Sequence, residues 1–367
     1  MSYERDNVRR MAGYVFGEQP RDPGIVKLNT NENPYPPSPA VADAIRSFDA
    51  GTLRRYPPAT AERFRCQVAT RFGLSADQVV VTNGGDEALR LALTTFVDPG
   101  ATFGTTEPGY SLCPVLANVQ GCELASVELN ADWSMPDGFA ARMNAAGAKL
   151  TCLVNPHAPS GVLVDADTVA AVARELHGVL LVDEAYVDFV DPELRHDLTS
   201  LLPDHDNLLL LRTLSKGHAL AGVRVGFLLG STGLVDPIIN KTRDSYNVDT
   251  LAQVAAQAAF ADRGYAERGW RAVRGERRRV TEGLVELGFA VPESQSNFVL
   301  AEAPPGVSAT ALFTGLREGG ILVRHFDTPR LSSSLRITVG TASENDLLLA
   351  AVTEITPGPR ASVRSRN

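Results

Sequence analysis

Short hydrophobic runs recur through the first two thirds of the chain. Each is rich in Val and Leu and lacks the polar alternation of a strand that has one face in water. Continuous runs of this length are typical of strands covered on both faces. Helical patterns separate them, which predicts an α/β fold with a largely parallel sheet between helices. The runs are residues 78–81, 150–154, 179–182, 208–211 and 225–229.

The pattern changes after about residue 252. A helical stretch leads into a charged segment, 267–288, that is typical of a solvated helix. Three strand-like runs (297–301, 320–324 and 335–339) and a last helix, 343–354, predict a smaller α+β domain. We therefore expect an N-terminal arm (1–30), a large domain (31–255), a small C-terminal domain (256–355) and a frayed tail (356–367).

Composition excludes several classes of protein. The 367 residues carry a net charge of −8, whereas a general nucleic-acid binder needs a basic surface. The four cysteines form no CxxC pair and the six histidines show no metal-ligand spacing, so we expect reduced thiols and no metal. No apolar run is long enough for a membrane span or a signal peptide. We therefore expect a cytoplasmic protein that binds neither nucleic acid nor membrane.

The residues that follow the predicted strands carry the chemistry. Asn155, Asp183 and Lys216 follow three of them, and a Gly84-Gly85 turn follows the strand at 78–81 and opens a helix. In open α/β sheets, ligands bind beyond the carboxyl ends of the strands. Each element alone is weak, because turns and helix caps use the same residue types. Their joint placement at one edge is the stronger signal.

This set of side chains suits pyridoxal 5'-phosphate. A lysine forms a Schiff base with the cofactor aldehyde, and a carboxylate such as Asp183 keeps the pyridine nitrogen protonated. The free N–H groups of a helix that begins at a glycine turn hold a phosphate. Tyr186, three residues after Asp183, is within reach of the ring hydroxyl, and Arg224 supplies a further cation for the phosphate.

The chain resembles the fold-type I aminotransferases that depend on this cofactor, and among them the histidinol-phosphate aminotransferase branch. The resemblance runs from about residue 7 to 353 and implies a seven-stranded sheet in the large domain. Its most specific segments are LNTNENPYP (28–36), TNGGDEAL (82–89), DEAYVDF (183–189), LRTLSKGHALAGVRVGF (211–227) and LRITVGT (335–341).

The resemblance implies a role for each matching position. Lys216 matches the Schiff-base lysine, and Asp183 matches the aspartate at the pyridine nitrogen. Tyr186 matches the tyrosine at the ring hydroxyl, and Asn155 matches the asparagine that lies at that hydroxyl and near the substrate. Tyr110 matches the tyrosine over the ring face, and the phosphate-binding positions are Gly85, Asp86, Thr213, Ser215 and Arg224. Tyr56 matches a tyrosine that reaches the neighbouring subunit's cofactor, which implies a homodimer with shared active sites.

The sequence departs from the family pattern at three places. His157 lies in NPHAPSG (155–161), where the family has NPNNPTG, and His218 lies in SKGHALAG (215–222), where the family has SKAFxLAG. A packed loop histidine is the simpler interpretation of His218, although contact with a substrate is open. The arm tyrosine, Tyr14, follows a glycine instead of the usual proline, which leaves its placement over the substrate open.

The implied reaction is ping-pong transamination with 2-oxoglutarate as the acceptor. The amine of Lys216 moves the proton of the substrate. Arg336 matches the arginine that binds the acidic group of the substrate. A phosphate dianion is stabilised more than a carboxylate by a second guanidinium, which Arg324 would supply. We therefore expect histidinol phosphate as the amino donor, in histidine biosynthesis.

Three alternatives stay open. An aromatic amino-acid aminotransferase would use an aromatic pocket made by Tyr14, Tyr35 and Tyr110. A threonine-phosphate decarboxylase shares the fold and a similar lysine segment. A cofactor-sensing regulator would need a DNA-binding module, for which the roughly 30 residues before the core are too few.

Overall fold

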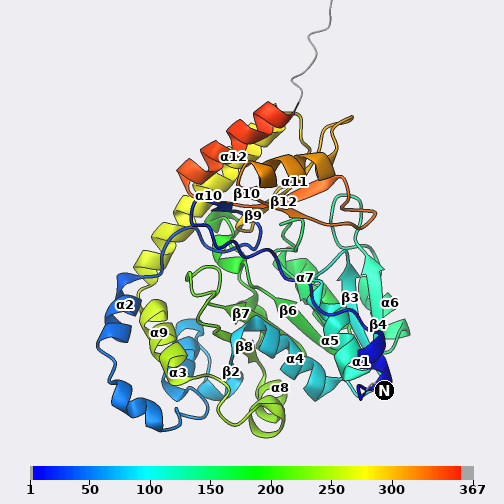
Figure 1. Cartoon of the computed structure of the whole chain (residues 1–367). Coiled ribbons are helices and arrows are strands. Elements are labelled where there is room, and N and C mark those ends of the chain that lie inside the picture. The colour runs from blue at the N-terminus through cyan, green and yellow to red at the C-terminus, as the bar shows by residue number, and fades with distance from the viewer. Residues whose placement is uncertain (1–2, 357–367) are drawn as a thin grey trace, which may run out of the picture.

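The computed structural model describes residues 3–356 and shows a large sheet packed between helices, with a smaller part above it (Figure 1). The predicted tail therefore lies outside the described residues, except for its first position. The sheet has the order β2-β8-β7-β6-β5-β3-β4. Its strands are β2 (Val79–Thr82), β8 (Gly226–Gly230), β7 (Leu208–Thr213), β6 (Val179–Asp183), β5 (Ala148–Val154), β3 (Thr102–Glu107) and β4 (Glu123–Glu128).

The sheet is parallel except at β8, which runs antiparallel to both of its neighbours. The five hydrophobic runs are strands, as predicted. The sequence pattern missed β3 and β4. Strand β3 is rich in threonine, and β4 is an exposed edge strand, so neither carries a hydrophobic run.

Each central strand sends alternate residues into two separate cores, which explains its continuous hydrophobic run. In β6, Leu180 and Val182 face one core and Leu181 faces the other. The first core is covered by α3 (Glu62–Phe72), α6 (Phe139–Ala145), α7 (Ala166–Glu175) and α9 (Thr250–Ala261). The second is covered by α4 (Gly84–Phe96), α5 (Leu112–Gln120) and α8 (Thr232–Pro237).

The smaller part is an antiparallel sheet under helices. Its strand order is β11 (Arg324–His325), β12 (Ser334–Thr338) and β9 (Phe298–Glu302). The helices α10 (Arg263–Glu286), α11 (Ala309–Glu318) and α12 (Ala342–Ile355) pack with it around a third core. The run predicted as one strand at 320–324 is divided, because β10 (Ile321–Leu322) pairs with β1 (Val26–Lys27) whereas β11 pairs with β12.

The N-terminal segment joins the two parts. Helix α1 (Asp6–Arg10) lies against α5, where Arg5 and Asn7 donate hydrogen bonds to the carbonyls of Val119 and Asn118. The chain then crosses the molecule to the smaller part, where β1 lies (dark blue in Figure 1). It continues through α2 (Pro39–Arg46), which packs on α9.

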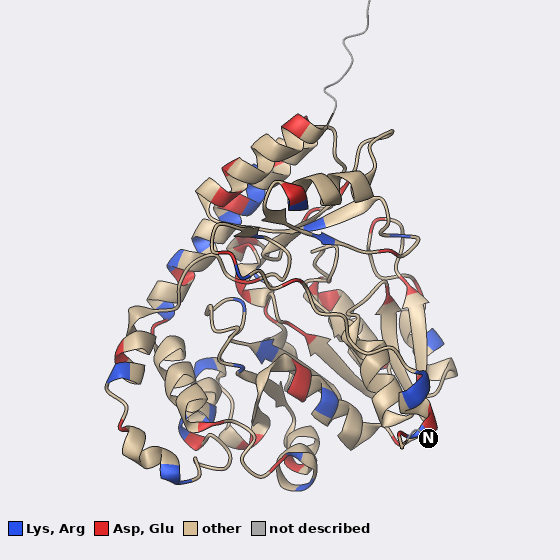
Figure 2. Cartoon of the chain, viewed as in Figure 1, with Lys and Arg blue, Asp and Glu red and all other residues tan. Residues whose placement is uncertain are grey.

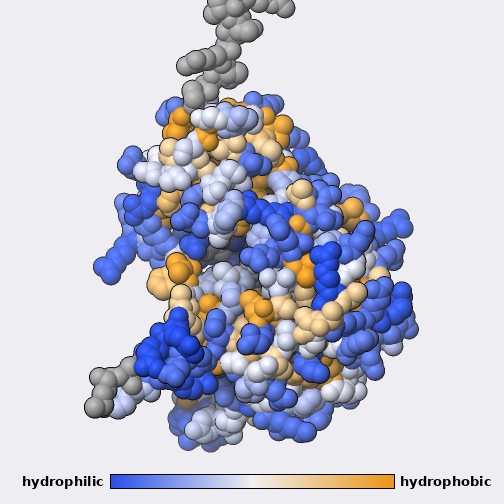
Figure 3. Space-filling model, turned by 90° about the vertical axis from the view of Figure 1, so that its right-hand side faces the viewer, coloured by the Kyte–Doolittle hydropathy of each residue, from blue (hydrophilic) through white to orange (hydrophobic). Residues whose placement is uncertain are grey.

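Charged residues lie mainly on the helices and loops, and those of the large sheet lie at or next to the ends of their strands (Figure 2). On the face shown in Figure 3, hydrophobic residues form small patches among hydrophilic ones. None of the helices in residues 3–356 combines the length and the apolar character that crossing a membrane requires. The remaining short helical turns are η1 (Ala50–Arg54), η2 (Ala76–Gln78), η3 (Val187–Phe189), η4 (Pro192–Leu194), η5 (Leu198–Leu201) and η6 (Ile238–Thr242).

Candidate active site

The topology brings the predicted residues to one edge of the sheet. Asn155 and Asp183 stand at the carboxyl ends of the parallel strands β5 and β6, and Lys216 follows β7 by three residues. Because β8 is reversed, its amino end lies at this same edge and brings Arg224 there. Strand β2 is antiparallel to β8, so its carboxyl end also meets this edge and leads into Gly84 of α4.

Lys216 is half-buried in the loop after β7. Its Nζ donates a hydrogen bond to the carbonyl of Thr30 at 3.1 Å and lies 6.0 Å from the centre of the Tyr186 ring. Burial, with a smaller effect from Arg336, lowers the pKa of Lys216 to about 8. A substantial fraction of the amine is therefore neutral at mildly alkaline pH, as a nucleophile or proton carrier requires.

Asp183 is a buried carboxylate at the end of β6. Its Oδ1 accepts a hydrogen bond from the N–H of Ala185 at 3.0 Å. Burial raises the pKa of Asp183 to about 7, and the charge of Lys216 partly opposes this rise. A buried carboxylate needs a cationic partner to stay ionised, and a protonated ring nitrogen would provide one.

A cradle for an anion lies at the start of α4. The first turn of this 13-residue helix begins with Gly84, Gly85 and Asp86, and its N–H groups have no partner within the helix. The guanidinium of Arg224 lies directly over Gly84, where a Cβ would come within 2.6 Å of it. Arg224 also donates to the hydroxyl of Ser215 at 3.3 Å and contacts Asp86 at 3.4 Å.

The hydroxyl groups beside this cradle complete it. Thr213 donates to Ser215 at 2.9 Å, and both side chains are buried at the end of β7. Glycine-turn N–H groups, a guanidinium and hydroxyls together form the donor set that a phosphate prefers. The cradle, the amine of Lys216 and the carboxylate of Asp183 fit the three polar ends of pyridoxal 5'-phosphate.

Four tyrosines lie in and around the site. The hydroxyl of Tyr186 accepts a hydrogen bond from Asn31 at 3.0 Å, and the hydroxyl of Tyr110 donates to Asp86 at 3.1 Å. The ring of Tyr14 meets the ring of Tyr110 edge-on, with 6.3 Å between their centres. The arm residue Tyr14 is therefore at the site, although it follows a glycine. Tyr35 packs against the same cluster as Tyr110 and Tyr186.

Two arginines face each other across strands β11 and β12. Arg324 and Arg336 are register partners in this antiparallel pair, so their side chains stand side by side. Arg336 donates to the carbonyl of Asn29 at 3.2 Å, and its buried Nε has no partner among the described residues. Arg324 donates to the carbonyl of Val15 in the arm at 3.3 Å. The pair forms a concentrated positive charge.

Two of the predicted residues are engaged elsewhere. The amide of Asn155 exchanges two hydrogen bonds with the backbone of Val164, at 2.8 and 2.9 Å. Tyr56 is 80% exposed and stacks on Tyr246, with 4.4 Å between the ring centres. Tyr56 would therefore act on a cofactor only across a subunit interface, and this role stays a prediction.

The two unusual histidines are packed inside the protein. His157 bonds Ser160 and the carbonyl of Pro108, both at 2.8 Å. His218 lies between the rings of Phe260 and Trp270. Burial is the main cause that lowers the pKa of each histidine to about 4, so both are neutral near pH 7.

The sequence patterns missed the loop of residues 29–31. Its carbonyls accept from Arg336 and Lys216, and its Asn31 side chain contacts Tyr186. Asn29 and Asn31 are buried although the loop is neither helix nor strand. The repeated asparagines of LNTNENP are the signal that would have pointed to it, because buried polar side chains need partners.

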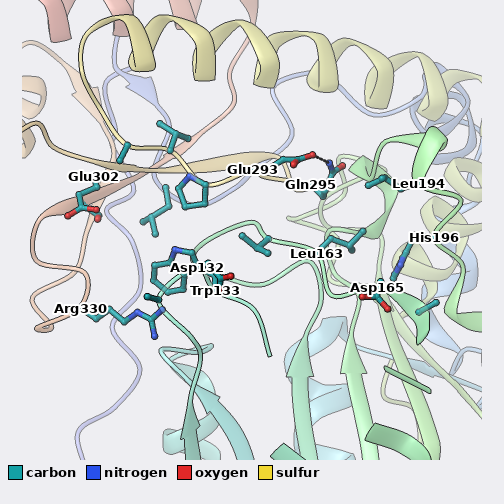
Figure 4. A pocket seen from close by; sticks show the side chains of 18 of the residues that line it. Asp132, Trp133, Leu163, Asp165, Leu194, His196, Glu293, Gln295, Glu302 and Arg330 are labelled. Carbon is teal, nitrogen blue, oxygen red and sulfur yellow. Dashed lines mark hydrogen bonds between the residues drawn. The ribbon is translucent and has the colours of Figure 1, made fainter. Parts of the chain in front are cut away.

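A large cavity lies apart from this cluster. It has a volume of about 850 Å³ and lies between the two parts of the chain. Figure 4 shows Trp133 and Arg330 on one side of it and His196 with Asp165 on the other. Arg330 covers the ring of Trp133 at 4.1 Å, and Asp165 caps helix α7 through Thr168. Most of its polar side chains thus already have partners.

Comparison with known proteins adds a family to this geometry. Residues 23–352 match the family described as aminotransferase class I and II. Histidinol-phosphate aminotransferase 1 of Nostoc sp. is 40% identical over 96% of this chain and 98% of its own length. The histidinol-phosphate aminotransferase of Microcystis aeruginosa is likewise 40% identical over 96% of this chain and 98% of its own.

Solved structures agree with the fold. The crystal structure of histidinol-phosphate aminotransferase from Sinorhizobium meliloti, in complex with pyridoxal-5'-phosphate, matches with a TM-score of 0.88 and 27% identity over 97% of this chain and 98% of that one. A Thermus thermophilus aspartate aminotransferase mutant has a TM-score of 0.80 at 22% identity, covering 97% of this chain and all of that one, and shows the fold alone. The predictions of the fold class and of an aminotransferase are confirmed. The chain therefore belongs to the class I and II aminotransferases and, within them, to the histidinol-phosphate aminotransferases.

Proposed function

We propose that this aminotransferase moves the amino group of histidinol phosphate to 2-oxoglutarate, by a ping-pong mechanism at the cluster around Lys216. Its cofactor is pyridoxal 5'-phosphate, which withdraws electrons from the bond to the substrate Cα when it is bound. The observation that carries the choice of donor is the paired Arg324 and Arg336 across β11 and β12.

The residues of the chain divide the chemical work. The carboxylate of Asp183 would hold a proton on the pyridine nitrogen, since burial makes an unpaired charge there costly. The amine of Lys216 would carry the cofactor and, once released, take the proton from the substrate Cα and return it one step later. Its lowered pKa favours this role, because a protonated amine cannot accept a proton.

The cradle at α4 would hold the cofactor phosphate. Gly85 and Asp86 would offer backbone N–H groups, and Thr213, Ser215 and Arg224 would offer side-chain donors. Tyr110 would cover one face of the ring, and Tyr186 would reach the ring hydroxyl. Asn155 would join them only if its amide shares or exchanges the bonds to Val164.

The arginine pair would grip the acidic end of the substrate. A phosphate dianion gains from two guanidiniums, whereas the side-chain carboxylate of glutamate is satisfied by Arg336 alone. The aromatic-aminotransferase alternative draws support from Tyr14 and Tyr110, whose edge-on pair would also border a phenyl ring. An imidazole fits the same border, so the arginines decide between the two donors.

The test compares histidinol phosphate, phenylalanine and glutamate as donors for native protein and for Arg324→Ala. We expect histidinol phosphate to be the best donor, and kcat/KM for it to fall about tenfold to a hundredfold in the variant, because a charged hydrogen bond contributes about 1.5–3 kcal/mol. Glutamate should be affected much less. The control is Arg317→Ala, which removes an exposed cation of α11 that pairs with Glu18. Preference for phenylalanine would refute the proposal.

The assembly belongs to the same proposal. The exposed Tyr56–Tyr246 stack supports a homodimer in which each subunit contributes Tyr56 to the other site. The expected domain boundaries and the cytoplasmic location stay predictions.

A further inference from the structure

Asn31 connects the small part of the molecule to the hydroxyl of Tyr186. It is 2% exposed and lies in the loop between β1 and α2, with a left-handed backbone (φ 55°). Its Nδ2 is 3.0 Å from the hydroxyl oxygen of Tyr186, which belongs to the large sheet side of the site. Asparagine tolerates this backbone conformation better than most residues, which suits it to the position.

The backbone of Asn31 is held from the small part on both sides. Its N–H donates to the hydroxyl of Thr338 at 2.9 Å, and its carbonyl accepts from Asn297 at 3.0 Å. Thr338 ends β12 and Asn297 precedes β9. The neighbouring Leu28 continues the contact, because its carbonyl accepts from the N–H of Thr338 at 2.9 Å. The position of the Asn31 amide therefore follows the small sheet.

The same network orients the amide. The hydroxyl oxygen of Thr338 accepts from the Asn31 N–H, and its own proton points to Asn31 Oδ1 at 3.2 Å. This arrangement turns Nδ2, the donor end, toward Tyr186. A tyrosine hydroxyl that accepts one bond keeps its proton for another acceptor. Burial raises the pKa of Tyr186, so the proton is retained at neutral pH.

We propose that Asn31 is a positioning residue that makes Tyr186 a hydrogen-bond donor to the ring hydroxyl oxygen of the cofactor, and that does so only while the small part is docked. The inference rests on the proposed placement of the cofactor ring beside Tyr186. Without Asn31, the Tyr186 hydroxyl can rotate and share its proton with other acceptors. The donated proton stabilises the negatively charged form of the ring oxygen.

The test is the pH titration of the visible absorbance of the holoenzyme, with Asn31→Asp as the main variant. A carboxylate accepts and cannot donate, so it would draw the Tyr186 proton away from the cofactor. We expect the midpoint of the titration to rise by about one pH unit, which corresponds to a tenfold change in the equilibrium. Asn31→Ala, which adds no charge, should shift it in the same direction.

Three further variants separate positioning from general damage. Tyr186→Phe should raise the midpoint alone, and adding Asn31→Asp to it should raise it no further, because both act on one proton. Asn207→Asp replaces a half-buried amide just before β7, at the opposite edge of the sheet, which donates to three carbonyls. Asn207→Asp should lower the stability of the protein in urea and leave the midpoint of the pH titration unchanged.

Each outcome decides the matter. An unchanged midpoint in Asn31→Asp would mean that Asn31 accepts the Tyr186 proton instead of directing it, and the proposal would be wrong. Additive shifts in the double variant would also overturn it. A native protein with no visible cofactor absorbance would overturn the proposed function together with this inference, so the two failures are distinguishable.

Discussion

Replacement of Gly217 by alanine should disturb Lys216 through a steric contact. A Cβ on Gly217 would lie 2.0 Å from Oδ2, 2.6 Å from Cγ and 2.7 Å from Cβ of Asp188. All three distances are far below van der Waals contact, so the whole Asp188 side chain would have to move. Asp188 belongs to the short helical turn η3, and burial raises the pKa of its carboxyl to about 6.

The backbone cannot easily move instead. The carbonyl of Gly217 accepts from Trp270 Nε1 at 2.7 Å, and the carbonyl of Lys216 accepts from Asn33 Nδ2 at 2.9 Å. Overpacking of this kind costs about 1–3 kcal/mol. A shift of about 1 Å in a reacting group can lower the rate by roughly a hundredfold. We therefore expect Gly217→Ala to lose about 1–3 kcal/mol of unfolding free energy and about tenfold to a hundredfold in kcat.

Urea unfolding and steady-state transamination measure both quantities. Gly222→Ala is the matched control, since this exposed glycine in the same loop has no heavy atom within 4 Å of a Cβ. Its stability should stay within about 0.5 kcal/mol of native. Adding Asp188→Ala to Gly217→Ala should recover part of the loss. A Gly217→Ala protein with native stability and kcat would show that the contact is relieved without cost, and the reasoning would be refuted.

Three further changes test other parts of the structure. Arg212→Ala should cost about 3–5 kcal/mol of stability in urea, because it strands the buried carboxylate of Glu184, to which Arg212 now donates at 2.8 Å. Native protein should become less stable as the pH falls from 7 to 5, and in His218→Phe this decrease in unfolding free energy should be smaller by about 2 kcal/mol. The reason is that the pKa of His218 in the folded protein, about 4, lies below its value in the unfolded chain. Mixing inactive Lys216→Ala and Tyr56→Ala subunits should restore activity in heterodimers.

The sign of the pH effect follows from proton uptake. A histidine that stays neutral in the fold binds its proton only after unfolding, so its stabilising contribution is lost as the pH falls from about 6.5 toward 4. An unchanged acid profile in His218→Phe would contradict this. Arg46→Ala, in an exposed pair with Asp43, is the control for Arg212→Ala and should cost at most about 1 kcal/mol. Proven subunit exchange without recovered activity would exclude shared sites.

Sequence reasoning reached the centre of the site because strand ends are a local signal. Asp183 and Lys216 follow Val- and Leu-rich runs, and parallel strands deliver their ends to one edge. The reversed strand β8 was not foreseen, yet it explains why Arg224 arrives at this edge from its amino end. The resemblance supplied Tyr110 and Arg336, which no local pattern would have linked to Lys216.

Hydrophobic patterning assigned no role to the loop at 29–31, and the reason is physical. Its partners, Tyr186, Lys216 and Arg336, lie far along the chain, and its bonds join two parts of the molecule. Hydrophobic periodicity reports which face of an element is buried, and it is silent about a loop whose polar groups are satisfied across such distances. Strands β3 and β4 were missed because polar residues interrupt the expected run.

The pairing of β1 with β10 determines when part of the small domain can fold during synthesis. Val26 pairs with Ile321, so residues from the two ends of the chain must meet in one small sheet. During synthesis, β1 and all strands of the large sheet leave the ribosome well before β10 does. Contacts between such distant segments form late and slowly. A small part produced from residues 256–355 alone would lack this strand and leave the edge of β10 unpaired, as a template for association.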